Sequence, residues 1–473
     1  MPVDLTDTRA LVVGLGVSGN AAAEALQAAG AQVRVVEPGR GEALEERAAR
    51  LAAAGVEVLR GQADVAGLLA ERTLVVPSPV VAPHAPLLVA ARRLGLEIVS
   101  EPELAWRMAG GRTRLVAVTG TNGKTSTTEL LAALLGVPAG GNIGMPLTAM
   151  LSRPAAALPP LVVTELSSFQ LRHSSTLAPD VALMLNLAPD HLDWHGSFVA
   201  YGASKARIWG AQSGAQLALV NADDAEASGL FEAHPPPARR ATFGLAAGAA
   251  RDREEEPGLA AVRKGRLWWH DAGGERRPLL RMDELAVTGR HQLSNVCAAV
   301  TAAVAAGADP DALGVPLRAF RPGTHRLQRV ATINDVAYVD DSKATNPHAA
   351  AAALASYPSV VWIAGGLNKG LSFDGLASLL PGRVRATVTI GSSGPALAAV
   401  ARGAGIPVVE AGILDEAVRA SAELARPGDT VLLAPACASM DQFTDYAARG
   451  RAFAQAVARL KGAATAQETT NGH

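Results

Sequence analysis

A glycine-rich loop that carries one lysine is the first feature with recognisable chemistry. Residues 115–126 read LVAVTGTNGKTS, so an apolar run enters the loop and an Ala/Leu-rich stretch leaves it. Glycines let consecutive backbone N–H groups turn toward phosphate oxygens where a helix begins. Lys124 supplies a charge for the β- and γ-phosphates, and the Thr125 hydroxyl can ligate Mg²⁺. Although it is two residues shorter than the usual G-x-x-x-x-G-K-S/T loop, the segment predicts a site for ATP or a close relative.

Acidic and basic side chains follow the next expected strands. Glu165 stands directly after the apolar run 161–164, and His191 follows the strand after that. Ligands of a parallel sheet lie beyond the carboxyl ends of its strands, so Glu165 is placed to ligate Mg²⁺ and His191 to reach a metal or the substrate. Either residue alone would more often be structural, but neighbouring strand ends beside a phosphate loop favour a functional role. Lys205 stands on an expected helix, where composition alone favours a solvated lysine.

A second glycine loop, GLGVSG at residues 14–19, follows the first apolar run and opens an expected helix. Glu37 ends the second run about 18 residues later, which is the layout of a dinucleotide fingerprint whose acid meets a ribose. A single loop of this kind is compatible with NAD, with another phosphate-bearing ligand, or with close helix packing and no ligand. Beside an ATP-type loop, it favours a second nucleotide in one enzyme.

Further polar clusters follow expected strands in the last third of the chain. They are His325–Arg326, DSKATN at residues 341–346 and APACASMDQF at residues 434–443. Their side chains suit phosphate, ribose and carboxylate groups. Cys437 could act as a nucleophile, but no histidine is near it in sequence, and a small buried thiol is the favoured interpretation.

The elements that must position these residues read as an α/β fold. Short branched apolar runs alternate with longer Ala/Leu-rich stretches of helical spacing, which favours mostly parallel sheets covered by helices. A chain of 473 residues predicts about three domains. Glycine and proline near residues 110 and 322 give the expected domains 1–110, 111–321 and 322–462, with a flexible tail at 463–473. The charged, Gly-rich segment 246–281 is expected to be a peripheral excursion.

Composition limits the kinds of partner. The 43 basic and 44 acidic residues give a net charge of −1, so nothing favours general binding to nucleic acid, and anionic ligands must be held locally. No apolar stretch reaches the length of a membrane span, and acids stand where a secretory signal would carry bases. Two cysteines are too few for a disulfide framework or a thiolate metal site. We therefore expect a cytoplasmic enzyme that binds neither nucleic acid nor membranes.

Taken together, the motifs resemble those of the Mur ligases. GTNGKTS, GNIG, ELSSFQ, Asp190–His191, DSKATN and APACASMDQF stand in the order seen in that family. The resemblance covers the chain except the tail and the segment 246–281. The ATP loop is common to all Mur ligases and to the folylpolyglutamate synthetases, whereas ELSSFQ, DSKATN and ACASMDQF resemble the branch that adds D-glutamate.

The resemblance implies a fold and a reaction. The fold has a Rossmann-like N-terminal domain that holds UDP, a central P-loop ATPase domain and a Rossmann-like C-terminal domain, which reassigns the first glycine loop from NAD to UDP. In this family ATP phosphorylates the carboxylate of UDP-N-acetylmuramoyl-L-alanine, and the amine of D-glutamate attacks the resulting acyl phosphate. Peptidoglycan synthesis is the implied process, and a monomer is expected.

The resemblance also implies roles for single residues. Lys124, Glu165, His191 and Lys205 would be catalytic. Thr125, Glu165 and His191 would ligate Mg²⁺, and Lys205 would join them once CO₂ had N-carbamylated it to an anion. ATP would contact Gly120, Thr121, Asn122, Gly123, Lys124, Thr125, Ser126, Asn295, Arg326 and Asp341. UDP-N-acetylmuramoyl-L-alanine would contact Ser18, Glu37, Ser78 and Asn142, and D-glutamate would contact Thr345, Lys369, Ser439 and Tyr446.

Some positions depart from the family pattern. Tyr446 stands where phenylalanine is common, Gln292 replaces an asparagine near the adenine site, and the turn from Glu37 to Arg40 differs from the usual uracil-contact turn. None of these changes touches the phosphate loop or Glu165. Two alternatives remain: an ATP-dependent ligase of Mur or folylpolyglutamate type that joins another amino acid, and a nucleotide-responsive regulatory protein without turnover.

Overall fold

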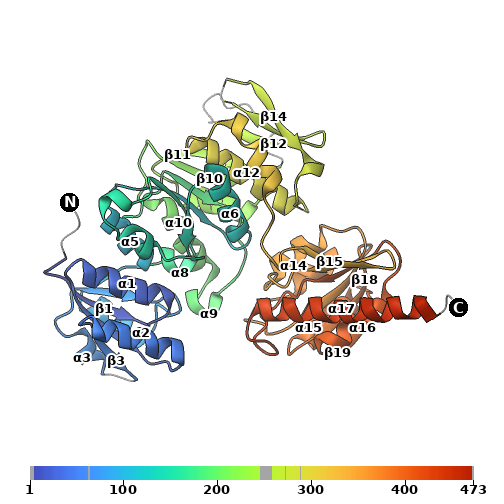
Figure 1. The fold of residues 1–473 in the computed structure, drawn as a ribbon, viewed down its shortest axis with the longest axis horizontal. Helices are drawn as coiled ribbons and strands as arrows, with labels where there is room; N and C mark the ends of the chain where they lie inside the picture. Colours follow the sequence, from blue (N-terminus) through green and yellow to red (C-terminus); the bar gives the residue numbers. More distant parts are fainter. Residues whose placement is uncertain (1–4, 62–63, 246–257, 272, 288, 471–473) are drawn as a thin grey trace. The chain divides into compact units, whose positions relative to one another are not determined.

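The computed structural model describes residues 5–61, 64–245, 258–271, 273–287 and 289–470 (Figure 1). The chain divides into two compact units, which are described separately. The first contains Met1–Leu187, Trp194–Leu285 and Ser294–Phe320, and the second contains Ala188–Asp193, Ala286–Leu293 and Arg321–His473.

The first unit begins with a five-stranded parallel sheet in the order β3-β2-β1-β4-β5. Strand β4 is buried throughout, β1 is buried after Arg9, and the three valines of β2 are buried, as expected when helices cover both faces of a sheet. The order reverses between β1 and β4, which is where open α/β sheets bind their ligands. The strands are Arg9–Val13, Gln32–Glu37, Glu57–Arg60, Leu74–Pro77 and Glu97–Ile98, and helices α1–α5 are Val17–Ala28, Glu42–Ala53, Val65–Leu69, Pro86–Arg93 and Glu101–Ala109.

A second sheet in the same unit has the order β11-β10-β9-β6-β8-β7, with parallel pairing between neighbours. Strand β6 is central and fully buried after its first residue, so its carboxyl end opens the phosphate loop from the middle of the sheet. Strands β6–β11 are Arg114–Thr119, Ala139–Gly141, Leu161–Glu165, Val181–Met184, Leu217–Asn221 and Arg239–Phe243. Helices α6–α11 are Lys124–Leu135, Leu147–Leu151, Ser168–Leu171, Leu192–His195, Phe198–Gly210 and Ala225–Ala233.

The described part of the segment 246–281 contains a small antiparallel sheet. Strands β12 (Leu259–Arg263), β13 (Arg266–His270) and β14 (Arg276–Arg281) pair in sequence order. The sheet packs on helix α12 (Arg290–Ala305), where the Thr301 hydroxyl accepts the Ala260 N–H at 3.0 Å. Trp269 on β13 is buried, so this part is integrated into the unit through its own apolar face. Residues 246–257 of the expected excursion lie outside the described residues.

The second unit is built on one six-stranded sheet in the order β15-β16-β20-β17-β18-β19. Only β15 runs antiparallel to its neighbour. Strands β15–β20 are Gln328–Ile333, Val336–Asp340, Val360–Gly365, Val384–Ile390, Val408–Gly412 and Thr430–Leu433. The helices are α13 (Gly314–Ala319, in the first unit), α14 (Pro347–Leu354), α15 (Gly394–Gly403), α16 (Leu414–Leu424) and α17 (Tyr446–Thr470).

Helix α17 packs beside α16 and continues much further than the sequence predicts. A flexible tail is expected from residue 463, but the helix runs on to Thr470. Residues 463–470 read AATAQETT, with three alanines and no glycine or proline, so no residue breaks the helix after Gly462. In the part of the chain that the structure describes, no helix is both long and apolar enough to cross a bilayer.

Candidate active site

The phosphate loop joins β6 to α6, as its sequence predicts. Gly120 and Gly123 both have positive φ angles, 152° and 83°, which side chains rarely adopt. A Cβ at Gly123 would lie only 2.5 Å from Nδ2 of Asn295 on α12. Glycine is therefore required at this position, and the loop backbone touches a side chain that the resemblance assigns to the ATP site.

Two side chains that were not predicted as site residues stabilise the conformation of the loop. Asn186, just beyond β9, accepts the Asn122 N–H on Oδ1 at 2.8 Å and donates Nδ2 to the Asn122 carbonyl at 2.9 Å. The Tyr201 hydroxyl lies 3.0 Å from the Thr121 hydroxyl. A polar residue at a strand end was a visible signal for Asn186. Tyr201 reaches the loop from a helix eighty residues away, and no motif marked it.

Two lysines converge on one carbonyl of the loop. Nζ of Lys124 donates to the carbonyls of Gly120 and Thr121, both at 3.0 Å, and Nζ of Lys205 donates to the Gly120 carbonyl at 2.7 Å. Since both nitrogens bond one oxygen, they lie within about 6 Å of each other, where like charges repel. Lys205 is 1% exposed, so it is not the solvated helix lysine that composition favours.

Glu165 ends β8 beside the loop, and its carboxylate is half satisfied. Oε1 accepts Nδ2 of Asn142 at 2.7 Å, whereas Oε2 is buried and has no hydrogen-bond partner. A buried, unpartnered carboxylate oxygen is a suitable ligand for a hard divalent cation. Among the described residues, no three His, Cys, Asp or Glu side chains gather closely enough to hold a metal ion by themselves. Glu165 therefore fits the role of one protein ligand of a Mg²⁺ ion whose other ligands are waters and phosphate oxygens.

The ELSSFQ segment is held from both sides. Ser167 caps α8, and its backbone N–H donates to Oε1 of Gln170 in a reciprocal capping box. His195 lies between this segment and α10: its Nε2 is 3.0 Å from Oγ of Ser168, and its Nδ1 is 3.4 Å from Oγ of Ser204. Since Lys205 follows Ser204, His195 fixes the Glu165 segment and the Lys205 helix relative to each other.

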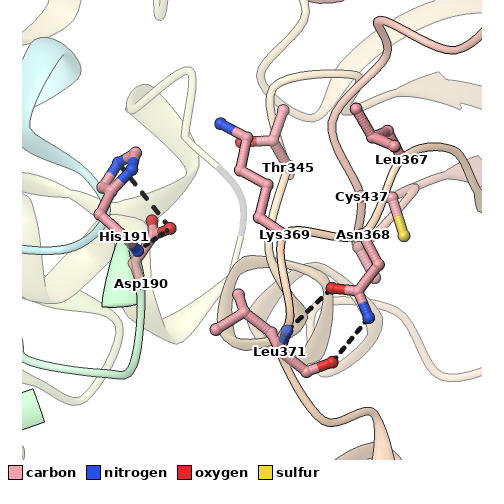
Figure 2. A pocket seen from close by; sticks show the side chains of 9 residues that line it. Asp190, His191, Thr345, Leu367, Asn368, Lys369, Leu371 and Cys437 are labelled. Carbon is pink, nitrogen blue, oxygen red and sulfur yellow. Dashed lines mark hydrogen bonds and ion pairs between the residues drawn. The ribbon is translucent and has the colours of Figure 1, made fainter. Parts of the chain in front are cut away.

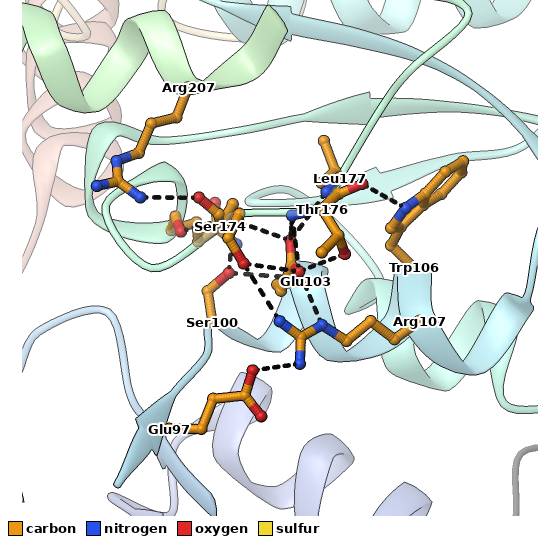
Figure 3. A network of polar contacts seen from close by, with 11 residues as sticks. Glu97, Ser100, Glu103, Trp106, Arg107, Ser174, Thr176, Leu177 and Arg207 are labelled. Carbon is orange, nitrogen blue, oxygen red and sulfur yellow. Dashed lines mark hydrogen bonds and ion pairs between the residues drawn. The ribbon is translucent and has the colours of Figure 1, made fainter. Parts of the chain in front are cut away.

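A buried carboxylate anchors the chain that follows α8, as Figure 3 shows. Glu103 on α5 accepts backbone N–H groups of residues 175–177 at 3.0 to 3.2 Å and the Thr176 hydroxyl at 2.6 Å. Arg107 donates to Glu103 at 2.8 Å and to Glu97 at 2.7 Å. These hydrogen bonds lower the pKa of Glu103 although burial alone would raise it. Helix α5 thus anchors the chain that follows the ELSSFQ segment.

The first glycine loop is packed against the start of its helix. Gly14 has a φ of 95°, and a Cβ there would lie 2.8 Å from the Ser78 side chain. Glu37 accepts the N–H groups of Leu15 and Gly39, both at 2.6 Å, one on each carboxylate oxygen. Helix α1, which carries Ser18, has no side-chain cap at its N-terminus, so an anion could approach it. Glu37 shapes the loop, and its expected contact with the ligand stays a prediction.

The second unit contains a pocket lined by two of the four expected D-glutamate residues (Figure 2). Thr345 and Lys369 line it together with Asp190 and His191, which belong to this unit. Nδ2 of Asn346 donates to Oδ2 of Asp190 at 3.1 Å, so the DSKATN loop is tied to the Asp190–His191 turn. The full lining is Asp190, His191, Thr345, Leu367, Asn368, Lys369, Leu371, Ala436 and Cys437.

The remaining expected residues of this unit lie around the same strand ends. Ser439 is buried, and the Tyr446 ring lies 3.9 Å below Nζ of Lys343. Cys437 lines the pocket, but burial raises the pKa of its thiol to about 12, so the inert-thiol interpretation suits it better than a nucleophile. Burial also raises the pKa of Asp341 to about 7, and nearby Arg326 opposes this shift.

Family models match the chain along most of its length. The Mur ligase MurD-like N-terminal domain matches residues 8–100, and the Mur ligase middle domain matches residues 118–303. The glutamate ligase domain of Mur ligases matches residues 325–437.

Curated relatives match almost the whole chain. It is 51% identical over 464 residues to a UDP-N-acetylmuramoylalanine–D-glutamate ligase of Frankia casuarinae, covering 96% of this chain and 94% of that one. It is 42% identical to the enzyme of the same name from Thermobifida fusca, covering 97% and 100%. The corresponding protein of Mycolicibacterium smegmatis is 39% identical, with 95% and 96% covered.

Solved structures share the fold at lower identity. The UDP-N-acetylmuramate–alanine ligase of Thermotoga maritima has a TM-score of 0.55 at 19% identity, covering 96% of this chain and 99% of that one. A pseudomurein peptide ligase type C of Methanothermus fervidus has a TM-score of 0.57 at 17% identity, covering 96% and 100%. On the strength of its full-length relatives and of three family models in their expected order, this chain belongs to the Mur ligase family.

Proposed function

We propose that this protein joins D-glutamate to UDP-N-acetylmuramoyl-L-alanine with hydrolysis of ATP to ADP and phosphate, as a cytoplasmic step of peptidoglycan synthesis. The observation that supports it most is the site around the phosphate loop: two lysines bond the Gly120 carbonyl just after β6, and Glu165, which has an unpartnered buried carboxylate oxygen, ends the neighbouring strand β8. A binding protein without turnover needs no such set. The names of its full-length relatives support the choice of substrates.

ATP would lie with its phosphates on the loop backbone. The N-terminus of α6 and the ammonium of Lys124 would face the β- and γ-phosphates, and Asn295 on α12 borders the loop at Gly123. Glu165 and Thr125 would hold Mg²⁺, with His191 for a second ion. When bound, Mg²⁺ offsets the negative charge that the transferring phosphoryl group carries.

The reaction proceeds through an acyl phosphate. A carboxylate oxygen of the L-alanyl group attacks the γ-phosphorus, and the bond from that phosphorus to the bridging oxygen of ADP breaks. The D-glutamate amine then attacks the acyl carbon, loses a proton, and expels phosphate as the amide forms. Lys124 neutralises charge on the phosphoryl oxygens, and the rigid loop aligns donor and acceptor.

We propose further that CO₂ carbamylates Lys205. As an ammonium, Lys205 lies buried within about 6 Å of the Lys124 ammonium and shares its acceptor, an arrangement of like charges that is costly. Carbamylation replaces that charge with an anion that attracts Lys124 and can ligate Mg²⁺. The remaining N–H of a carbamate can still donate to the Gly120 carbonyl.

The two organic substrates would use separate parts of the chain. The UDP group would lie at the reversal point between β1 and β4, near Ser18, Ser78 and the Glu37-braced loop, with Asn142 beside Glu165. D-Glutamate would enter the pocket of the second unit, with its carboxylates on Lys369 and on donors from Thr345, Ser439 and Tyr446.

The experiment is a phosphate-release assay with purified protein, ATP, Mg²⁺ and UDP-N-acetylmuramoyl-L-alanine. The proposal expects release that requires D-glutamate and ignores L-glutamate, with one amide formed for each phosphate. Turnover with a different amino acid would show another ligase of the family. Tight nucleotide binding without any turnover would show a regulatory protein.

A further inference from the structure

One buried cation of the second unit has no part in the reaction above. The Arg449 side chain on α17 is 1% exposed, and burial lowers its pKa to about 10. A buried guanidinium is costly unless its donors are satisfied in good geometry. Its five described hydrogen bonds end on backbone or hydroxyl oxygens, none on a carboxylate.

These bonds reach three different loops. Nε donates to Oγ of Ser342 at 2.9 Å, and Nη2 donates to the Ser342 carbonyl at 2.9 Å. Nη2 also donates to the Cys437 carbonyl at 3.1 Å, and Nη1 to the Ala438 carbonyl at 3.3 Å. The third loop is reached at the Gly365 carbonyl, 3.5 Å from Nη1. One planar group therefore ties together the ends of β16, β17 and β20.

Each of these loops carries one expected D-glutamate contact. Thr345 follows Ser342 in the DSKATN loop, Lys369 follows the end of β17, and Ser439 follows Ala438 directly. The Ser342 hydroxyl also donates to the Tyr446 carbonyl at 2.7 Å, so the fourth expected contact joins the same network. We infer that Arg449 is a positioning residue that fixes the D-glutamate-binding loops relative to one another; this inference rests on the proposed function.

The backbone around the guanidinium supports this role independently. Residues 367 and 438 exchange two hydrogen bonds, at 2.8 and 3.0 Å, in an isolated antiparallel bridge between two of the loops. Gly366 has a φ of 134°, and a Cβ there would lie 2.2 Å from the Ala438 carbonyl oxygen and 3.1 Å from Nη1 of Arg449. The backbones of these two loops are therefore in direct contact, and the Arg449 guanidinium packs beside that contact at Gly366.

The chemistry requires arginine rather than any cation. Five N–H donors in one rigid plane can serve carbonyls that lie in different directions, whereas a lysine presents a compact charge with three donors. Arg449→Lys keeps the positive charge and loses the planar set of donors. The variant therefore distinguishes an effect of the hydrogen-bond geometry from an effect of the charge. The exposed Arg451, two residues along the same helix, provides the matched control Arg451→Lys.

The test measures steady-state constants for all three substrates. We expect Arg449→Lys to raise the KM for D-glutamate at least tenfold, with the KM for ATP and for UDP-N-acetylmuramoyl-L-alanine within twofold of wild type and Arg451→Lys unchanged. An unchanged KM for D-glutamate would overturn the inference, and so would an equal rise in all three constants, which a general loss of structure would produce.

Three further variants keep the test decisive. If Arg449→Lys does not fold, two other variants test the same role. Ser342→Ala removes one acceptor of the guanidinium and should raise the KM for D-glutamate about threefold, and Arg449→Ala should regain affinity for D-glutamate when free guanidinium is added. Neither effect would appear if the inference is wrong. Lys369→Met tests the pocket itself. A normal KM for D-glutamate in that variant contradicts the proposed pocket, whereas a raised one beside a normal Arg449→Lys contradicts only the role of Arg449.

Discussion

Lys124 and Lys205 share the Gly120 carbonyl as an acceptor, and this contact gives the two residues different expected roles. Lys124 begins α6 and is partly exposed, so it can follow an incoming phosphate. Lys205 is buried and cannot move into solvent. The first is therefore suited to act on the nucleotide and the second to organise the site.

Replacing Lys124 by alanine tests the phosphate loop. The variant loses the charge that faces the transferring phosphoryl group, so kcat should fall at least 100-fold, which corresponds to about 3 kcal/mol of transition-state stabilisation. The measurement is phosphate release under saturating substrates, with the melting temperature as a check on folding. Near-normal turnover would contradict the loop's assignment.

Carbon dioxide tests the state of Lys205. Removing CO₂ and bicarbonate from the buffer should lower activity, and restoring bicarbonate should recover it, because the carbamate forms reversibly. Protein equilibrated with ¹³CO₂ should show one carbamate carbon signal that is absent from Lys205→Ala. Full activity without CO₂, together with no such signal, would show that the residue acts as an ammonium.

At the scale of elements, helix α5 carries two acids with different surroundings. Glu103 accepts several N–H groups and an arginine, so its pKa is lowered. Glu101 accepts the Thr148 N–H at 2.5 Å and the Thr148 hydroxyl at 2.7 Å on Oε1, and no ion pair offsets its burial among the described contacts. Burial therefore raises the pKa of Glu101 to about 7. The surroundings of α5 thus favour the ionised form of Glu103 and disfavour the ionised form of Glu101.

Glu101 makes stability depend on pH. Its pKa is higher in the folded state than the ordinary value of 4.5, so its stabilising contribution is complete at acidic pH and is lost as pH rises through 7. Glu101→Gln stays neutral and keeps the acceptor for Thr148. Its free energy of unfolding should gain up to about 3 kcal/mol over wild type between pH 5 and 8. Denaturant titrations at both pH values check this, and a constant difference would contradict it.

The sequence predicts elements well where one local pattern specifies them. Apolar runs marked the buried strands of the three large, mostly parallel sheets, and the glycine loops marked where helices begin. The three-domain α/β prediction is confirmed by the sheets and by the family models. Its boundaries and the roles of single site residues stay predictions. The most visible difference is α17, whose alanine-rich end continues the helix where a tail was expected.

What the sequence could not predict are contacts between distant segments. Glu103 meets residues 175–177 across more than seventy positions, and Arg449 reaches Ser342 across 107. Nothing local distinguishes either residue from a solvated helix charge. Their acceptors and donors are mostly backbone groups, which every residue has, so no side-chain motif marks the partner. Such residues are found only when the fold brings the backbones together.

At the scale of the whole molecule, a chain of net charge −1 has no basic excess with which to attract anionic substrates. On the proposed function, helix N-termini, a few lysines and buried donors would hold them, and buried interactions are screened little by salt. We expect the KM for ATP to change less than about threefold between 50 and 200 mM KCl at fixed free Mg²⁺. A much steeper dependence would show that a long-range basic surface attracts the nucleotide.

The central claim is the acyl phosphate intermediate, and oxygen labelling tests it most directly. UDP-N-acetylmuramoyl-L-alanine is prepared with ¹⁸O in both carboxylate oxygens and is incubated with ATP, Mg²⁺ and D-glutamate. Since the attacking carboxylate oxygen stays on phosphorus when the amine expels phosphate, the account predicts one ¹⁸O in each released phosphate and one in the amide. Phosphate without ¹⁸O, or release that does not depend on D-glutamate, would contradict it.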